Sequence, residues 1–215
     1  MFLNRYGVYI EMSAQDGRMI LWGTDIDDVQ YPTREGFIQF CQAQKGSTAS
    51  LKNLRMYHIE QALGISYKEL KQWFEEYYTT PMFHALRPYD DAQRIIQLLL
   101  GRGEGIVTTA RPDHLRHKTY EALERDFGSR VFSGVYFTND HDNNPGAQTK
   151  VKLCQELGVT LFLEDNLRIA LECAGAGIEV FLIDQPWNQT DQELPENIHR
   201  VKSLTHAYES MNGHH

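Results

Sequence analysis

The sequence predicts an α/β protein built on a parallel sheet that helices cover on both faces. From residue 85 onward, short runs of the kind that form strands alternate with longer segments of helical periodicity. The strand-like runs are almost wholly apolar, which is typical of strands buried on both faces. Such an alternation favours βαβ units with right-handed connections, and therefore three layers of secondary structure.

The elements after residue 85 begin with an amphipathic helix. This helix, "DAQRIIQLLLGRG", ends at Gly101 or Gly103, and "GIVTT" at 105–109 is a short buried strand. The next helix begins near Pro112 and ends at Gly128. The remaining elements are strands at 131–137, 159–163 and 178–184, and helices at 149–158 and 166–177. The strand at 178–184 is expected to be the last one.

The segment between about 34 and 84 breaks this alternation. Two aromatic-rich stretches, 33–44 and 66–78, have helical periodicity, and no good strand lies between them. Pro81 and Pro88 mark the return to the sheet. The expected organisation is an α/β core of residues 1–29 and 85–215 with a small helical cap at 30–84. Within that cap, aromatic side chains at helical spacing pack its interior, and one of them could stack on a substrate base: Phe74, Tyr77 and Tyr78.

The N-terminal stretch gives conflicting signals. "MILWG" at 19–23 is expected to be the central strand, whereas residues 8–23 resemble a hairpin that turns at Asp16 and Gly17. A central strand of a parallel sheet has neighbours on both edges, which leaves no room for a long hairpin partner. Either the first strand lies elsewhere, or residues 1–17 are a loose extension.

Composition excludes several classes of protein. A net charge of −8 disfavours binding to a nucleic acid polymer or to an anionic membrane. No apolar run approaches the roughly 18 residues of a membrane helix, and no secretion signal is evident, so a cytoplasmic location is expected. Cys41, Cys154 and Cys173 are odd in number and unpaired in spacing, which argues against a disulfide framework or a zinc ribbon.

Polar residues follow four of the expected strands. In an open parallel sheet, ligands bind beyond the carboxyl ends of the strands, so these residues should converge on one edge. They are Asp25, Asp27 and Asp28; Thr108, Thr109 and Arg111; Thr138, Asn139 and Asp140; and Glu164 and Asp165. Solvated turns would account for one or two such groups, whereas four predict a site.

Two acidic clusters with a hydroxyl and a lysine between them suit phosphoryl transfer. That chemistry needs a nucleophile, a proton donor, a divalent cation and donors for the phosphoryl oxygens. A carboxylate that attacks a phosphate dianion meets a repulsion of about 4 kcal/mol for each pair of unit charges 4 Å apart at an effective dielectric near 20. A cation such as Mg²⁺, which prefers oxygen ligands, would reverse that field.

The same residues resemble the motifs of the haloacid dehalogenase-like phosphohydrolase superfamily. "DIDDV" at 25–29 looks like the first motif, and "IVTTAR" at 106–111 looks like the second. "TKVKLCQELGVTLFLEDN" at 149–166 resembles the third and fourth motifs. The ending "FLIDQPWNQ" at 181–189 is similar to a branch grouped with the C-type 5′(3′)-deoxyribonucleotidases. Each motif alone is weak evidence, but the ordered set spans nearly the whole core.

The resemblance implies a role for each acidic residue. Asp25 would be the nucleophile that forms an aspartyl-phosphate, and Asp27 would protonate the leaving oxygen and then activate water. Mg²⁺ would be held by Asp25, the backbone carbonyl of Asp27 and Asp165. Glu164 would support the cation directly or through water.

The resemblance also implies phosphate-binding residues. Thr109 would hydrogen-bond the phosphoryl group, with Thr108 as a one-residue alternative. Lys150 would neutralise the phosphate and orient the nucleophile, and Lys152 fits the spacing less well. Arg111 would contact the substrate phosphate or form a structural salt bridge.

Two positions depart from the commoner pattern of the superfamily. Asp28 and Gln30 stand where many members have Gly and Leu, so the effect on activity is open. The second acid, Asp27, separates this reading from a dehalogenase, which needs no proton donor for an oxygen leaving group. The simpler alternatives are that Asp25 and Asp27 form a solvated turn, and that Glu164 and Asp165 merely cap the following helix.

The implied activity is a Mg²⁺-dependent phosphomonoesterase for a small phosphorylated substrate, with nucleoside monophosphates favoured. The alternatives are a phosphatase for sugar phosphates or other small phosphoesters, and a phosphate-ligand-binding protein that has lost turnover. Neither the physiological substrate nor the oligomeric state follows from the sequence.

Overall fold

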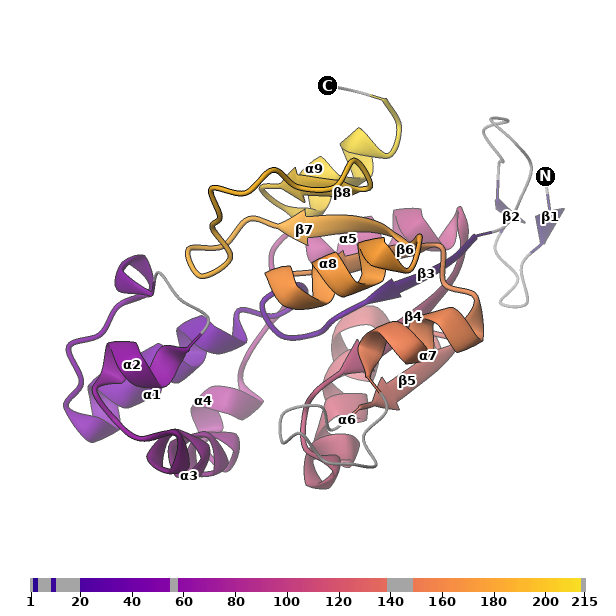
Figure 1. The fold of residues 1–215 in the computed structure, drawn as a ribbon. Coiled ribbons are helices and arrows are strands. Elements are labelled where there is room, and N and C mark those ends of the chain that lie inside the picture. Colours follow the sequence, from indigo (N-terminus) through magenta and orange to yellow (C-terminus); the bar gives the residue numbers. More distant parts are fainter. Residues whose placement is uncertain (1, 4–8, 11–19, 55–57, 139–148, 214–215) are drawn as a thin grey trace.

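The computed structural model describes residues 2–3, 9–10, 20–54, 58–138 and 149–213. Its centre is a sheet of six strands in the order β5-β4-β3-β6-β7-β8, all parallel (Figure 1). The strands are β3 (Ile20–Thr24), β4 (Gly103–Thr109), β5 (Gly134–Phe137), β6 (Leu161–Glu164), β7 (Glu179–Ile183) and β8 (Ile198–Val201). The expected α/β fold with a Rossmann-like parallel sheet is therefore confirmed.

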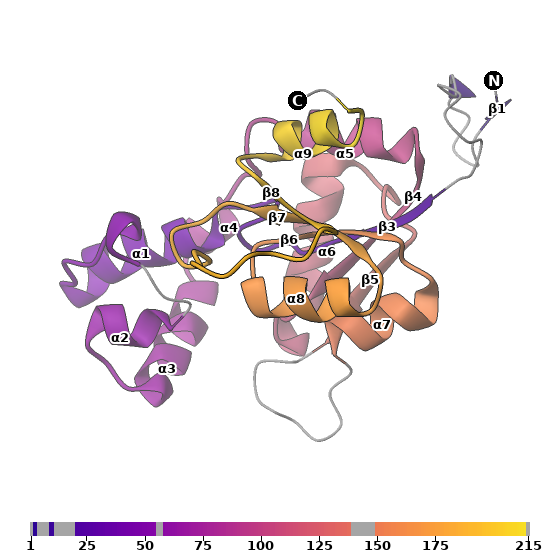
Figure 2. The same ribbon diagram turned by 45° about the horizontal axis from the view of Figure 1, so that its top comes forward.

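Helices cover both faces of this sheet, as Figure 2 shows. They are α5 (Ala92–Leu100), α6 (Arg116–Phe127), α7 (Lys150–Leu157), α8 (Leu167–Gly175) and α9 (Leu204–Ser210), with a 3₁₀ turn η2 (Asp113–Leu115) before α6. Helices α5, α6 and α9 share one buried hydrophobic cluster with the sheet, and α7 and α8 share another. None of the helices within the described ranges is long and apolar enough to cross a bilayer.

Between β3 and α5, the regular elements within the described residues are all helices, and they lie beyond one end of the sheet (Figure 1). They are α1 (Thr33–Lys45), η1 (Leu51–Asn53), α2 (Ile59–Leu63), α3 (Tyr67–Tyr78) and α4 (Pro81–His84). Helix α3 begins with a capping box, in which Ser66 and Glu69 satisfy each other's backbone N–H groups. The division at residues 30 and 84 into cap and core stays a prediction.

A third hydrophobic cluster, here called the cap cluster, fills the space between these helices. The ring of Phe37 on α1 stacks on that of Phe74 on α3, with centroids 3.8 Å apart. Two members of the cluster come from outside residues 30–84, namely Leu115 and Trp187. The buried members are Phe37, Ile38, Phe40, Cys41, Ala49, Leu54, Ile59, Leu70, Tyr77, Phe83, Leu115 and Trp187. Apolar contact thus joins the segment 30–84 to the loops at the edge of the sheet.

Three local expectations were wrong. Residues 178–184 do not contain the last strand, because β8 follows β7 on the outer edge of the sheet, and α9 follows β8. Strand β8 was missed because "IHRV" is short and half polar, as expected of an edge strand with one solvated side. Pro81 does not end the helical segment but begins α4, at the helix position where proline's missing N–H is harmless.

The N-terminal hairpin was also wrong in its pairing. Tyr9–Ile10 (β2) pairs antiparallel with Phe2–Leu3 (β1), and β3 has β4 and β6 as its two neighbours. The expected turn at Asp16 and Gly17 lies outside the described residues. The central position expected for the strand at 19–23 is confirmed.

Gly103 provides a stability test of the pairing between β3 and β4. A Cβ atom added at Gly103 would overlap the carbonyl oxygen of its strand partner Ile20. We expect Gly103→Ala to lower the free energy of unfolding by about 1–3 kcal/mol, because a backbone atom cannot move aside as a flexible side chain can. Urea denaturation followed by circular dichroism measures this change.

The matched control is Gly175→Ala at the end of α8, where an added Cβ meets nothing within 4 Å. We expect this variant to be unchanged or slightly stabilised. Equal stability of the two variants would contradict the close approach of Gly103 and Ile20.

Candidate active site

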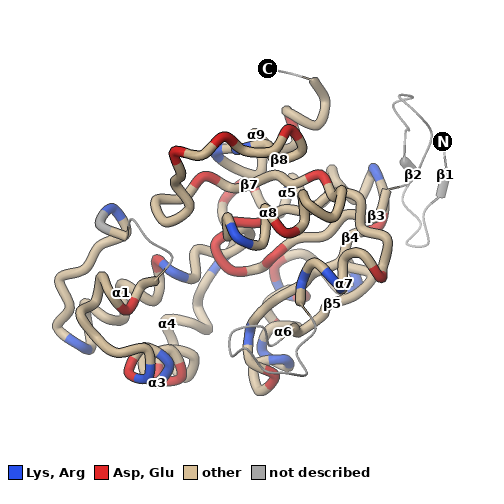
Figure 3. Tube along the Cα trace, viewed as in Figure 1, with Lys and Arg blue, Asp and Glu red and all other residues tan. Residues whose placement is uncertain are grey.

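The predicted site residues gather at the carboxyl edge of three adjacent strands. Asp25 directly follows β3, Thr109 ends β4, and Glu164 ends β6. The backbone N–H of Asp25 donates to the carbonyl oxygen of Leu163 at 3.0 Å, which fixes the end of β3 against β6. Figure 3 shows the run of acidic residues, in red, along the loop that leaves β3.

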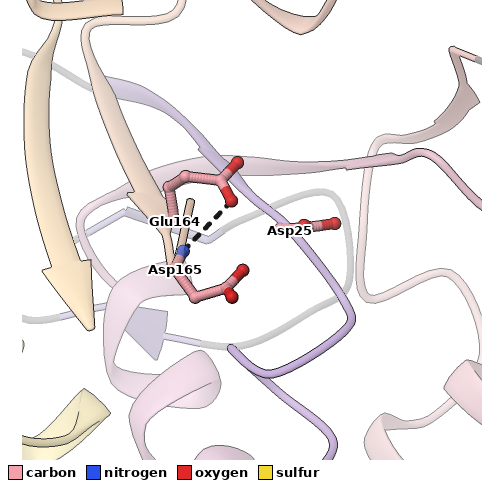
Figure 4. A group of neighbouring side chains, drawn as sticks. All are labelled: Asp25, Glu164 and Asp165. Atoms are coloured by element: carbon pink, nitrogen blue, oxygen red, sulfur yellow. Dashed lines mark hydrogen bonds between the residues drawn. The ribbon is translucent and has the colours of Figure 1, made fainter. Parts of the chain in front are cut away.

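Three buried carboxylates form what we call the acidic trio: Asp25, Glu164 and Asp165. Each offers an oxygen that lies within 4.8 Å of those of the other two (Figure 4). Burial is the main reason that the pKa of each is raised to about 7; a neighbouring carboxylate adds to this effect at each residue, and Lys150 opposes it at Asp25 and Glu164. Crowded carboxylate oxygens of this kind fit a hard divalent cation, whose charge would stabilise their ionised forms.

Lys150 is the cation that the structure brings to this trio. Its Nζ lies 2.5 Å from Oδ2 of Asp25 and 3.0 Å from Oε2 of Glu164, and its side chain is 2% exposed. Thr149 caps α7 by accepting a backbone hydrogen bond with its side chain, which places Lys150 at the first position of the helix. Lys152, the alternative by spacing, is exposed and lies 3.9 Å from Glu156.

Glu164 is held by the chain through both of its carboxylate oxygens. Oε2 pairs with Lys150, while Oε1 accepts the backbone N–H groups of Asp165 and Asn166, each at 3.0 Å. Asn166 in turn caps α8. Helix capping and the ion pair with Lys150 therefore occur together at this turn, and both oxygens of Glu164 already have partners within the chain.

Asp27 lies apart from the trio and pairs with Arg111. Its Oδ1 is 2.7 Å from Nη2 of Arg111, and its Oδ2 is 3.0 Å from Nε, so the pair is bidentate. Thr33 at the start of α1 donates to the same Oδ1 at 2.5 Å. Burial alone would raise the pKa of Asp27, but the guanidinium outweighs it and holds the pKa below the usual value.

The two candidate threonines at the end of β4 differ in their partners. Both are fully buried. Oγ1 of Thr109 accepts the backbone N–H of Arg111 at 3.1 Å, so its own hydroxyl hydrogen stays available to a ligand. Oγ1 of Thr108 has no hydrogen-bond partner within the described parts of the chain.

Asp28 occupies a backbone conformation that explains one departure from the superfamily pattern. Its φ is 60°, in the left-handed region that glycine adopts without strain. Its carboxylate accepts the backbone N–H of Arg34 at 2.8 Å, which ties the loop to the first turn of α1. Local hydrogen bonding of this kind is what makes aspartate tolerable at such a position.

Gln30, Trp187 and Asn188 also contact the site, and none of them was assigned a role from the sequence. Gln30 donates to the carbonyl oxygen of Asp25 at 3.0 Å, and Trp187 donates from Nε1 to Oδ2 of Asp165 at 2.8 Å. Asn188 donates to the carbonyl oxygen of Asp165 at 2.8 Å. The only sequence signal for Trp187 and Asn188 is their place in "QPWNQ", because neither tryptophan nor asparagine is a residue type that by itself predicts contact with a carboxylate.

The strand-end group at 138–140 is only partly described. Thr138 is buried and donates from Oγ1 to the carbonyl oxygen of Thr109 at 3.2 Å, so it joins β5 to β4. Asn139 and Asp140 lie outside the described residues.

Comparison with solved structures tests the fold. A haloacid dehalogenase-like family hydrolase from Streptococcus pneumoniae superimposes with a TM-score of 0.65 at 14% identity, covering 90% of this chain and 98% of that one. The chain has the fold of the haloacid dehalogenase-like hydrolases. An L-2-haloacid dehalogenase from Xanthobacter autotrophicus shares it with a TM-score of 0.57 at 12% identity, over 91% of this chain and 99% of that one. This fold therefore serves more than one chemistry.

Two sequence relatives of this chain carry nucleotidase names. A nucleotidase of Clostridium acetobutylicum is 27% identical over 173 residues, which is 80% of this chain and 83% of the relative. A protein of Halalkalibacterium halodurans with a provisional nucleotidase name is 26% identical over 188 residues, 86% of this chain and 89% of its own length. No family model matches the chain. These relatives confirm the resemblance to nucleotidases that the motifs indicated, and they support a phosphatase.

The buried cluster around Lys150 provides a stability test of the site. We expect Lys150→Met to lower the free energy of unfolding by about 3–5 kcal/mol, because it leaves two buried carboxylates without their cation. Lys152→Met, two positions along the same helix, should change it by less than about 1 kcal/mol, since that lysine is exposed. Urea denaturation of both variants makes the comparison, and similar losses would contradict the assignment of Lys150 to the acidic trio.

Proposed function

We propose that this protein is a Mg²⁺-dependent phosphomonoesterase that forms an aspartyl-phosphate on Asp25 and acts on nucleoside monophosphates. One observation carries the proposal. The buried carboxylate of Asp25 pairs with Lys150 and has an oxygen within 4.8 Å of the other two members of the acidic trio, and a second acid, Asp27, follows it two residues later. A solvated turn would leave these groups exposed and unpaired.

The cation would be held by Asp25, Asp165 and the backbone carbonyl of Asp27, with Glu164 in support. When bound, it supplies the positive charge that a phosphate dianion needs to approach a carboxylate. The other phosphate-binding groups are Thr109 and Lys150.

In the first step, one oxygen of Asp25 attacks the phosphorus atom, and the bond from phosphorus to the leaving oxygen breaks. The backbone N–H of Ile26 donates to Oδ1 of Asp25 at 2.7 Å, and Lys150 holds Oδ2, so the carboxylate is fixed in orientation. A proton from Asp27 goes to the leaving oxygen. In the second step, Asp27 takes a proton from water as that water attacks phosphorus, which releases phosphate and restores Asp25.

Proton transfer by Asp27 requires a rearrangement of Arg111. In this structure the bidentate pair with Arg111 keeps Asp27 ionised, and an ionised carboxylate has no proton to donate. Arg111 would therefore turn from Asp27 toward the anionic substrate when the substrate binds. We therefore include Arg111 among the proposed substrate-binding residues.

The proposed substrate class rests on the nucleotidase names of the relatives and on the aromatic residues of the segment 30–84. Phe74 stacks on Phe37, and Tyr77 is fully buried, so both serve the cap cluster. Tyr78 also packs against this cluster, with its ring centroid 5.0 Å from that of Phe83, but it is half-buried, and its pKa is raised above the usual range, first by burial and then by the charge of Asp27. Tyr78 is therefore the aromatic residue best placed to stack on a base, with the segment 30–84 acting as a cap over the site.

The first experiment measures phosphate release from deoxy- and ribonucleoside monophosphates and from small sugar phosphates, with Mg²⁺ and with EDTA. We expect Mg²⁺-dependent release that is highest with a nucleoside monophosphate, and at least about a 10³-fold loss in Asp25→Asn, because an amide is a poor nucleophile. A preference for sugar phosphates would reassign the substrate class.

Binding of beryllofluoride is the control for this experiment, since it requires a competent Asp25 and Mg²⁺ but no substrate. Binding without turnover would indicate an untested substrate. Failure to bind, in folded protein with Mg²⁺, would favour the ligand-binding alternative. Phosphate release retained by Asp25→Asn would remove Asp25 as the nucleophile.

Thr109 and Thr108 allow a matched test of the phosphate-binding hydroxyl. We expect Thr109→Val to lower kcat/KM by about 10²-fold, which is the loss typical of one donor to a developing oxyanion. Thr108→Val should keep activity and leave stability equal or higher, because it removes a buried hydroxyl without a partner. The opposite ranking would assign the phosphate-binding role to Thr108.

A further inference from the structure

The loop after β7 brings an indole to the acidic trio. Trp187 is 6% exposed, and its Nε1 donates to Oδ2 of Asp165, itself 4% exposed, at 2.8 Å. A hydrogen bond to a carboxylate in a buried setting is among the stronger ones in proteins, and it restricts the rotation of the acceptor. One of the two carboxylate oxygens of Asp165 therefore already accepts a hydrogen bond from the indole.

The same loop is anchored independently of the indole. The side-chain amide of Asn188 donates to the carbonyl oxygens of Asp165 and Ile183, at 2.8 and 2.7 Å. Its Oδ1 accepts from Arg200 on β8 at 2.6 Å. The backbone at Trp187 is thus fixed to β6, β7 and β8, and the indole acts from a rigid support.

Trp187 is also a buried member of the cap cluster. The guanidinium carbon of Arg34 on α1 lies 4.1 Å from the ring centroid, a cation–π contact. Arg34 also binds the carboxylate of Asp28 through its backbone N–H, at 2.8 Å, and through Nε, at 3.4 Å. The side chain of Trp187 therefore contacts Arg34 of α1 through its ring and Asp165 through its indole N–H.

We propose that Trp187 is a positioning residue that presents Asp165 to the cation as a ligand through one oxygen only. The inference rests on the proposed function, in which Asp165 holds Mg²⁺. Mg²⁺ demands near-ideal octahedral geometry with compact ligands, whereas Ca²⁺ accepts more ligand oxygens and bidentate carboxylates. Holding back one oxygen of Asp165 thus favours Mg²⁺ over Ca²⁺ at this site.

The test is calorimetric titration of metal-free protein with MgCl₂ and with CaCl₂, which needs no substrate and no turnover. Trp187→Phe keeps an aromatic ring but removes the N–H. We expect its Kd for Mg²⁺ to rise about 10- to 100-fold, the range found when a group that orients a metal ligand is removed, and its Kd for Ca²⁺ to rise less.

Trp73→Phe is the matched control. Trp73 packs against the same cap cluster, and it also has a cation over its ring, Lys45 Nζ at 5.4 Å from the centroid. Among the tryptophans that the structure describes, Trp187 is the one that donates to Asp165. We expect Trp73→Phe to bind Mg²⁺ as the unchanged protein does.

A spectroscopic measurement on the unchanged protein covers the case in which Trp187→Phe does not fold. Each of Trp22, Trp73 and Trp187 gives one indole N–H resonance in a ¹H–¹⁵N spectrum. The Trp187 resonance, assigned from its contact with protons of Arg34, should shift on addition of Mg²⁺. An unmoved Trp187 resonance at saturating Mg²⁺ would overturn the inference.

The outcomes separate this inference from the proposed function. Equal Mg²⁺ affinity of folded Trp187→Phe and the unchanged protein, or an equal loss in Trp73→Phe, overturns the role of Trp187 alone. A loss of Mg²⁺ affinity matched by an equal loss for Ca²⁺ overturns the selectivity. Absence of Mg²⁺ binding to the unchanged protein overturns the metal-dependent function and this inference with it.

Discussion

The structure of the site depends on one buried cation, Lys150, placed among three buried carboxylates. Desolvation of ionised groups is costly, and a single ammonium cannot balance the acidic trio. Helix α7 supplies the lysine, the turn before α8 supplies two backbone N–H groups to Glu164, and the loop after β7 supplies the Trp187 indole to Asp165. The remaining imbalance of charge is what makes this edge of the sheet suited to a divalent cation.

Charge is arranged differently only two residues further along the loop. Asp27 has its own guanidinium partner in Arg111, and Thr33 from α1 completes its hydrogen bonds. Asp25 therefore belongs to the acidic trio, whereas Asp27 pairs with Arg111 and Asp28 accepts the backbone N–H of Arg34. In the proposed function, this separation gives neighbouring aspartates the unlike roles of nucleophile and proton donor.

Periodicity was sufficient to predict β3 to β7, α1, α3 and α5 to α8, because the strand runs are apolar and the helical runs are amphipathic. It did not predict the short helices α2 and α4. It failed for β8, an edge strand whose alternating polar residues resemble a loop. The strand-end rule identified the acidic trio and Thr109 as neighbours. Contacts such as that of Trp187 with Asp165 could not be predicted, because they depend on how a loop folds back across the sheet rather than on any local pattern.

The strand order also has a consequence for how the chain reaches this structure. The first strand of the large sheet, β3, lies between β4 and β6, so that Ile20 pairs with Gly103 and Trp22 with Leu161. Pairing of strands that are distant in sequence costs loop-closure entropy and is therefore slow. Strand β3 is synthesised early, but it cannot form its pairings until β4 and β6 have been synthesised. The loop attached to it carries the proposed nucleophile and takes its final position only after β4 and β6 have paired with β3. In the proposed function, phosphate release would therefore report complete folding of this protein.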